Sequence, residues 1–143
     1  MNIIDELKWR GAVNQQTDEE GLYKLVGEKS ISLYCGIDPT GDSMHIGHLI
    51  PFMILKRFQL AGHHPVIVIG GRAGSFLGEY QAGGTILVLG QHTDGKPAAG
   101  YFPCTGQHGG RVIFRGDVSA LRFPLQVTPH PASEEELALL RPL

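Results

Sequence analysis

The chain has 143 residues, a net charge of −2 and 12 lysine and arginine residues, so the basic surface typical of nucleic-acid binding is not expected. Its hydrophobic content of 42% and charged content of 18% fit a folded chain better than a disordered one, and the length fits one domain. An acidic start without an apolar core predicts no secretion signal, and no apolar run approaches the roughly 18 residues of a membrane span. Cys35 and Cys104 stand in unrelated contexts, which predicts reduced thiols in a cytoplasmic protein, without a disulfide framework or a metal pattern.

Two helices are predicted near the N-terminus. Ile3–Trp9 has the pattern of a short amphipathic helix closed by Gly11. Thr17 and Glu20 have the spacing of a capping box, in which each side chain accepts a hydrogen bond from the backbone N–H of the other residue. A second helix is therefore expected to begin after Thr17 and to end near Gly27.

A strand, a helix and a second strand follow. Ser30–Cys35 alternates like a strand, and Val66–Ile69 is a continuous β-branched run typical of a strand covered on both faces. Between them, Ile46–Leu60 has apolar residues at helical spacing, with Pro51 expected to kink the helix slightly. The face expected to be buried consists of Ile46, Leu49, Ile50, Met53, Ile54 and Phe58. This order predicts one βαβ unit with a right-handed parallel crossover.

The second half is punctuated by glycine. Gly83–Gly90 and Gly109–Gly116 share the form Gly-Gly-x₅-Gly, 26 residues apart, and Val66–Gly71 is a looser copy about 20 residues upstream. Short strands closed by glycines favour stacked coils of a β-solenoid, and ordinary hairpins with glycine turns are the alternative. We expect strands at Thr85–Leu89 and Arg111–Arg115, stacked on or paired with the strand at 66–69.

The C-terminal part contains an extended segment marked by Pro124, Pro129 and Pro131. Ser133 and Glu136 form a second capping box that predicts a short terminal helix. The expected fold class is therefore α/β: a partial Rossmann-like βαβ unit with N-terminal helices, joined to short β-solenoid (β-helix) coils. The two parts are residues 1–70 and 71–143, which are expected to share the strand at 65–70 and one core.

The turn from the first strand into the long helix carries the candidate chemistry. A helix N-terminus presents free N–H groups and a partial positive charge to phosphate. His45 and His48 lie on one helical face, and Gly47 between them lets a phosphate or a flat ring approach the backbone. Asp38 and Thr40 add a carboxylate and a hydroxyl. The residues alone leave open surface histidines or a partial metal site, although no nearby Cys, Asp or Glu completes a zinc set.

The stretch from Asp38 to Leu49 resembles the HIGH signature of class I aminoacyl-tRNA synthetases. More widely, residues 1 to about 70 resemble the start of a bacterial tyrosyl-tRNA synthetase, including the segments at 7–15 and 33–36. The resemblance implies that Tyr34 lies by the hydroxyl of a substrate tyrosine and that Cys35 faces the ribose of ATP. It places Gly36 and Asp38 at the backbone of the site.

The same resemblance implies that Thr40, His45 and His48 meet ATP and the charge that develops on its phosphate during adenylate formation. The family's Lys-Met-Ser-Lys-Ser loop, its ligands for the tyrosine amino group and its anticodon-binding region have no counterpart in this sequence. We therefore expect no complete enzyme activity and no tRNA binding. Weak binding of ATP (with Mg²⁺) or tyrosine is the alternative.

Residues from about 65 to 143 resemble the glycine-repeat β-helix domain at the C-terminal end of glutamate synthase large subunits, through Gly74–Gly90 and Cys104–Gly116. That resemblance implies a structural role without catalytic residues, and Cys104 with His108 lacks the third group of a nucleophilic site. Two partial folds joined at one strand indicate a chimera, and an engineered recombinant is favoured over a natural gene fusion. A partner-dependent fragment, including a homodimer, is a further alternative because the coil edges are open.

Overall fold

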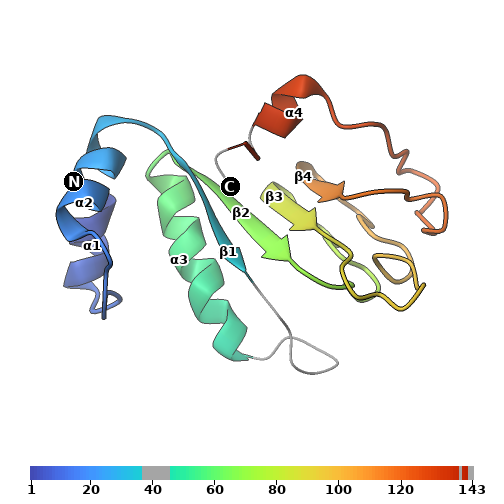
Figure 1. Cartoon of the computed structure of the whole chain (residues 1–143), viewed down its shortest axis with the longest axis horizontal. Helices are drawn as coiled ribbons and strands as arrows, with labels where there is room; N and C mark the ends of the chain where they lie inside the picture. Colours follow the sequence, from blue (N-terminus) through green and yellow to red (C-terminus); the bar gives the residue numbers. More distant parts are fainter. Residues whose placement is uncertain (37–45, 139, 142–143) are drawn as a thin grey trace.

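The computed structural model describes residues 1–36, 46–138 and 140–141 and has a mixed α/β fold (Figure 1). Its helices and strands, in chain order, are α1 (Ile3–Trp9), α2 (Glu19–Glu28), β1 (Ser32–Gly36), the 3₁₀ turn η1 (Ile46–His48), α3 (Leu49–Leu60), β2 (His64–Ile69), β3 (Ala82–Val88), β4 (Gly109–Phe114) and α4 (Glu134–Ala138). The four strands form one sheet in the order β1-β2-β3-β4. The expected α/β class and the expected order of elements are therefore confirmed.

Every strand pair in the sheet is parallel. Strand β2 pairs with β1 on one edge, with Tyr34 opposite Val66, and with β3 on the other edge, with Val66 opposite Thr85. Strand β4 continues the ladder from β3, with Thr85 opposite Arg111. Parallel pairing excludes hairpins between these strands, because a two-residue turn can join only antiparallel neighbours. The predicted strands at 85–89 and 111–115 are confirmed to within a few residues, and β2 connects both halves of the chain.

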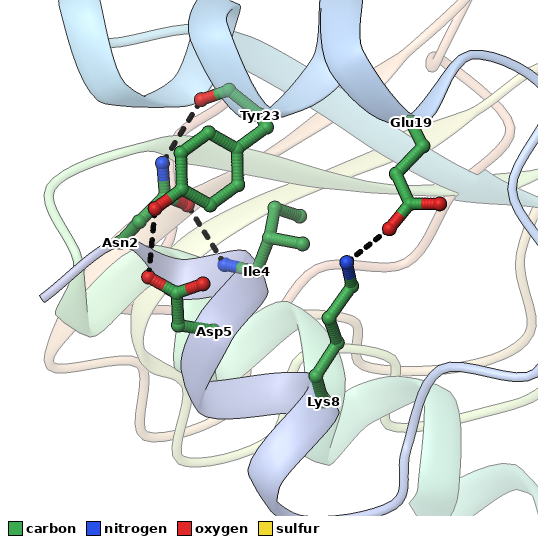
Figure 2. A network of polar contacts seen from close by, with 6 residues as sticks. All are labelled: Asn2, Ile4, Asp5, Lys8, Glu19 and Tyr23. Atoms are coloured by element: carbon green, nitrogen blue, oxygen red, sulfur yellow. Dashed lines mark hydrogen bonds and ion pairs between the residues drawn. The ribbon is translucent and has the colours of Figure 1, made fainter.

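Helices α1 and α2 are joined by the polar contacts in Figure 2. The Asn2 side chain accepts a hydrogen bond from the Ile4 N–H at 2.9 Å and donates one to the Tyr23 carbonyl at 2.9 Å. The Tyr23 hydroxyl donates to Asp5 at 2.9 Å. An exposed ion pair between Lys8 and Glu19 completes the set. These contacts hold the two helices together. Helices this short are not stable by helix propensity alone and depend on such contacts.

The predicted N-cap of α2 is wrong by one residue. Asp18, not Thr17, has the extended cap conformation, and its carboxylate accepts the hydrogen bond from the Gly21 N–H at 2.9 Å. An aspartate is among the preferred N-cap residues and its charge also favours the positive helix end, so it displaces the preceding threonine. The helix also continues past Gly27 to Glu28, where the Lys29 N–H closes the last turn.

The predicted buried face of α3 is largely wrong. Phe58 and Leu55 are the buried residues of this helix and Ile54 is half-buried, whereas Ile46, Leu49, Ile50 and Met53 are exposed. Phe58 and Ile54 pack in a core cluster with residues of α1 and α2. The rest of that cluster consists of Ile3, Ile4, Leu7, Val13, Leu22, Val26, Ile31 and Leu33. Because α3 is apolar on almost every face, the elements that pack against it determine which side is buried.

The kink predicted at Pro51 does not interrupt the helix. Pro51 is the third residue of α3, so it lies in the first turn. The first four N–H groups of a helix have no acceptor within the helix, and a proline there removes no ladder hydrogen bond. The helix therefore runs without interruption from Leu49 to Leu60.

The segments between the strands of the second half also lie side by side. The hydrogen bonds that join them run from the N–H of Ala73 to the carbonyl of Ala98 (2.9 Å), from Phe76 to Tyr101 (2.8 Å), from Tyr80 to Thr105 (2.9 Å) and from Gly100 to Gly74 (3.1 Å). Positive φ angles recur at the repeat spacing in the pairs Phe76 and Phe102, Gly78 and Cys104, Tyr80 and Gly106, Gly84 and Gly110, and Gly90 and Gly116. The sequence repeat is therefore also a repeat of backbone conformation.

A second core cluster lies under β2, β3 and β4. Its buried members are Ile69, Ala73, Val88, Ala99 and Leu121, and Val88 is fully buried. Beyond this cluster, the predicted terminal capping box is confirmed: the Glu136 N–H donates to the Ser133 hydroxyl at 3.2 Å, and the Ser133 N–H donates to the Glu136 carboxylate at 2.8 Å. This box begins α4.

His63 lies buried where α3 turns into β2. Its ring accepts a hydrogen bond from the Ile31 N–H at 3.4 Å and packs against Phe58. Burial, with a smaller contribution from His64, lowers the pKa of His63 below its ordinary value of 6.5. The fold therefore favours neutral imidazole.

Because the unfolded chain binds this proton more readily, we expect His63 to lower the free energy of unfolding as the pH falls below about 6.5. Urea titrations at pH 7.5 and 5.5 measure the effect. His63→Asn should reduce the difference between the two pH values, and His64→Asn, at the exposed neighbour, should preserve most of it because burial is the larger cause. An unchanged difference in His63→Asn would contradict the assignment.

Candidate functional site

The candidate site lies where β1 ends and α3 begins. Gly36 is the last residue of β1, and the 3₁₀ turn Ile46–His48 leads directly into α3, with His48 at the N-cap position. Figure 1 shows the end of β1 and the start of α3 on the same side of the molecule. This is the arrangement in which the N-terminus of a helix in a βαβ unit faces the carboxyl edge of the sheet and favours an anionic group.

Two of the predicted ligand contacts lie on β1. Tyr34 has 59% of its surface exposed, and Cys35 is half-buried with its thiol 3.6 Å from the Gly36 carbonyl. Successive side chains of a strand point to opposite faces, so Tyr34 shares a face with Val66 and Cys35 shares the other with Ile67. A ligand that touches both must therefore sit at the end of the strand and not over either face.

The other predicted site residues divide into two groups. Gly47 is exposed and His48 is half-buried, both in the turn before α3. Asp38, Thr40 and His45 lie outside the described residues, so the predicted convergence of the two histidines stays a prediction. Within residues 1–36, 46–138 and 140–141, no group of three His, Cys, Asp or Glu side chains could hold a metal ion.

Cys104 lies in the second half, far from this turn along the chain. The side chain is buried, and this burial raises the pKa of its thiol. A raised pKa disfavours the thiolate that a nucleophilic cysteine requires. His108 instead stacks on Tyr80, with 6.4 Å between ring centroids. These observations favour a structural Cys104, as the sequence predicted.

A feature that sequence reasoning missed is a groove of about 580 Å³ along β4. The segment containing Pro129 and Pro131 forms part of its lining, together with Arg111 and His130. The two prolines were the available sequence signal, because they indicated an extended segment. They could not indicate that the segment passes β4.

In the described part of the chain, no helix is long and apolar enough to cross a membrane.

The segment that contains the candidate site matches a known protein family. Residues 27–82 match the family model described as tRNA synthetases class I (W and Y). This stretch includes β1, the turn before α3, α3 itself and β2. The N-terminal segment is therefore synthetase-like.

The particular relatives are tyrosine–tRNA ligases. The chain is 85% identical over 75 residues to tyrosine–tRNA ligase 2 of Bacillus cereus (strain ZK / E33L), 80% identical over 75 residues to the ligase of Levilactobacillus brevis, and 83% identical over 75 residues to that of Pediococcus pentosaceus. Each match covers 52% of this chain and 18% of the relative. The N-terminal segment thus matches tyrosyl-tRNA synthetases, and the chain matches less than a fifth of their length.

Proposed function

We propose that the first half carries the part of a tyrosyl-tRNA synthetase site that faces ATP and tyrosine, without complete ligase activity. The observation that supports this proposal is the narrow extent of the match: 85% identity over a stretch that covers only 18% of the relative. High identity implies that the local geometry of the turn is kept. The small coverage means that most of the relative's sequence has no matched counterpart here.

The sheet topology supports the same proposal. Nucleotides in open α/β sheets bind in the crevice where the strand order reverses, so strands are needed on both sides of the first strand. In the described residues β1 is an edge strand, with β2 on one side and no strand on the other. One wall of such a crevice is therefore not supplied by the described residues.

Within this proposal, each predicted residue keeps the role that the resemblance implies. His45, His48 and Thr40 would contact the phosphates of ATP, with Mg²⁺ as the accompanying ion. Tyr34 and Cys35 would contact the tyrosine and the ribose. The remaining predicted contacts, Gly36, Asp38 and Gly47, would line the site with their backbone. Binding of ATP or tyrosine would be weak, because few of the contacts of a complete site are available.

For the second half we propose a structural role as a short glycine-repeat β-helix, similar to that of glutamate synthase, joined to the synthetase-like part in a chimera. The hydrogen bonds that join the segments between the strands support this role, as does the repeated backbone conformation. The side chain of Gln107 donates to that of Gln81, its equivalent in the preceding repeat, at 3.2 Å. Side-chain ladders of this kind are expected where identical coils stack.

This proposal predicts that tyrosyl-adenylate formation is absent. Tyrosine-dependent exchange of pyrophosphate into ATP should stay at the level of the His45→Ala/His48→Ala double variant, because contacts made only in the transition state are incomplete. Exchange clearly above that control would overturn it. Melting with and without ATP plus tyrosine tests the weaker alternative: a rise in Tm that the double variant lacks would establish residual binding.

A further inference from the structure

A second groove, of about 280 Å³, lies between α3 and strands β2 and β3. Helix α3 packs against β2, and Figure 1 shows it on the side of the sheet where β1 and β2 lie. Ile67 and Ile86, which lie opposite each other on β2 and β3, line the groove and pack against the second core cluster. The groove therefore lies where the long helix of the first half meets β3, the first strand of the second half.

The lining of this groove is mainly apolar. Phe52 and Leu55 line it from α3, and Pro65, Ile67 and Ile86 line it from the sheet. Ligand pockets have this composition: mostly hydrophobic and aromatic side chains, with a few polar groups that fix the orientation of the ligand. The volume lies near the lower end of the range of such pockets, about 300–1,000 Å³. Since a cavity of about 150 Å³ holds benzene, this groove suits an apolar body of roughly eight to ten carbon atoms.

Lys56 is the only charged side chain among the described residues that line the groove. Its ammonium donates to Gln59 Oε1 at 2.8 Å, and two of its three N–H donors are not used in this contact. Lys56 takes part in none of the ion pairs found among the described residues. The neighbouring cation on α3, Arg57, is instead paired with Glu6 at 3.4 Å. Because these lining residues include no carboxylate, the charge that the groove offers to a ligand is positive.

We propose that this groove binds an apolar carboxylate of the size of a medium-chain fatty acid, with its chain against Ile67 and Ile86 and its carboxylate on Lys56. Burial of the chain supplies most of the affinity, because the apolar lining removes it from water. Lys56 supplies the selectivity, since its ammonium attracts an anionic head group and repels a cationic one. The site does not depend on the proposed function, because none of its lining residues lies in β1 or in the turn before α3.

Gly83 keeps the groove open on the side of β3. A Cβ at this position would lie 3.6 Å from Nε2 of Gln59 on α3, which is an ordinary van der Waals contact. The backbone of Gly83 is not among those with a positive φ, so a side chain there carries no left-handed strain. A larger side chain at this position therefore occupies the groove while the strand keeps its conformation.

The test titrates the full chain with octanoate, octanol and octylammonium, three probes of equal chain length, and follows the backbone amides by NMR. Octanoate should bind with a Kd on the order of 1 mM, as expected for about ten non-hydrogen atoms in an open groove. Octanol should bind about threefold more weakly and octylammonium at least about tenfold more weakly. Lys56→Met keeps the apolar stem and should remove the preference for octanoate over octanol. Lys96→Met, at an exposed cation outside the lining, should preserve that preference.

Gly83→Val should weaken octanoate binding at least about tenfold, because the new side chain takes the space of the ligand. Gly74→Val is the matched control: it lies outside the lining, and a Cβ there meets nothing within 4 Å. Melting curves establish that each variant remains folded. The proposal would be overturned by an absence of saturable shifts, by equal binding of octanoate and octylammonium, or by binding that Gly83→Val leaves unchanged. Shifts centred on the exposed residues Ile50 and Met53 would also overturn it and would assign the probe to the outer face of α3.

Discussion

Replacing Phe58 by alanine is expected to lower the free energy of unfolding by about 3–5 kcal/mol, the usual cost of removing a buried phenylalanine. Phe58 is 8% exposed and links α3 to the cluster formed by α1 and α2. A folded domain is typically stable by about 5–15 kcal/mol, so this one change removes a large part of the total. Urea titration followed by far-UV circular dichroism measures the loss of helix as this cluster unfolds.

Met53→Ala on the same helix is the matched control. Met53 is 54% exposed, and its replacement is expected to change the free energy of unfolding by about 0.5 kcal/mol or less. The two variants together test which face of α3 is buried. The sequence periodicity predicted that both residues lie in the core, so equal and large losses would support the periodicity and contradict the packing described above.

Gly110→Ala is expected to destabilise the second half more strongly than the same change at Gly84. The two glycines are equivalent in the repeat and have nearly the same φ, +76° and +78°. At either position, this left-handed conformation costs an alanine about 1–2 kcal/mol. At Gly84 the new methyl group meets nothing within 4 Å, but at Gly110 it lies 2.7 Å from backbone atoms of Gly83 and Gly84.

Since these contacts are with backbone, the strands must move apart, and we expect a total loss of about 3–5 kcal/mol at Gly110. Far-UV circular dichroism during urea titration measures the free energy of unfolding of both variants. Hydrogen exchange should show the loss in the amides of β3 and β4. Equal effects of the two substitutions would mean that β3 and β4 do not approach as closely as described.

The local predictions from the sequence were accurate because they depend on neighbours along the chain. The helix Ile3–Trp9 has the predicted bounds, and the capping box of Ser133 and Glu136 forms as expected. The N-cap of α2 was misplaced because Thr17 and Asp18 are both suitable caps, and spacing alone favoured the threonine. The synthetase-like turn was also recognised from sequence, because its motif is contiguous.

The amino-acid sequence by itself determined the α/β class, the positions of the strands and the synthetase-like segment, since each follows from short-range patterns. Only the tertiary structure decided that α3 buries Phe58 and leaves Met53 exposed, because an apolar helix is oriented by the helices and strands that it contacts. It also decided that β3 and β4 extend the predicted parallel pair into one four-stranded sheet and that residues 127–132 pass β4. These features join segments that are distant along the chain, and periodicity within one segment carries no information about its distant neighbours.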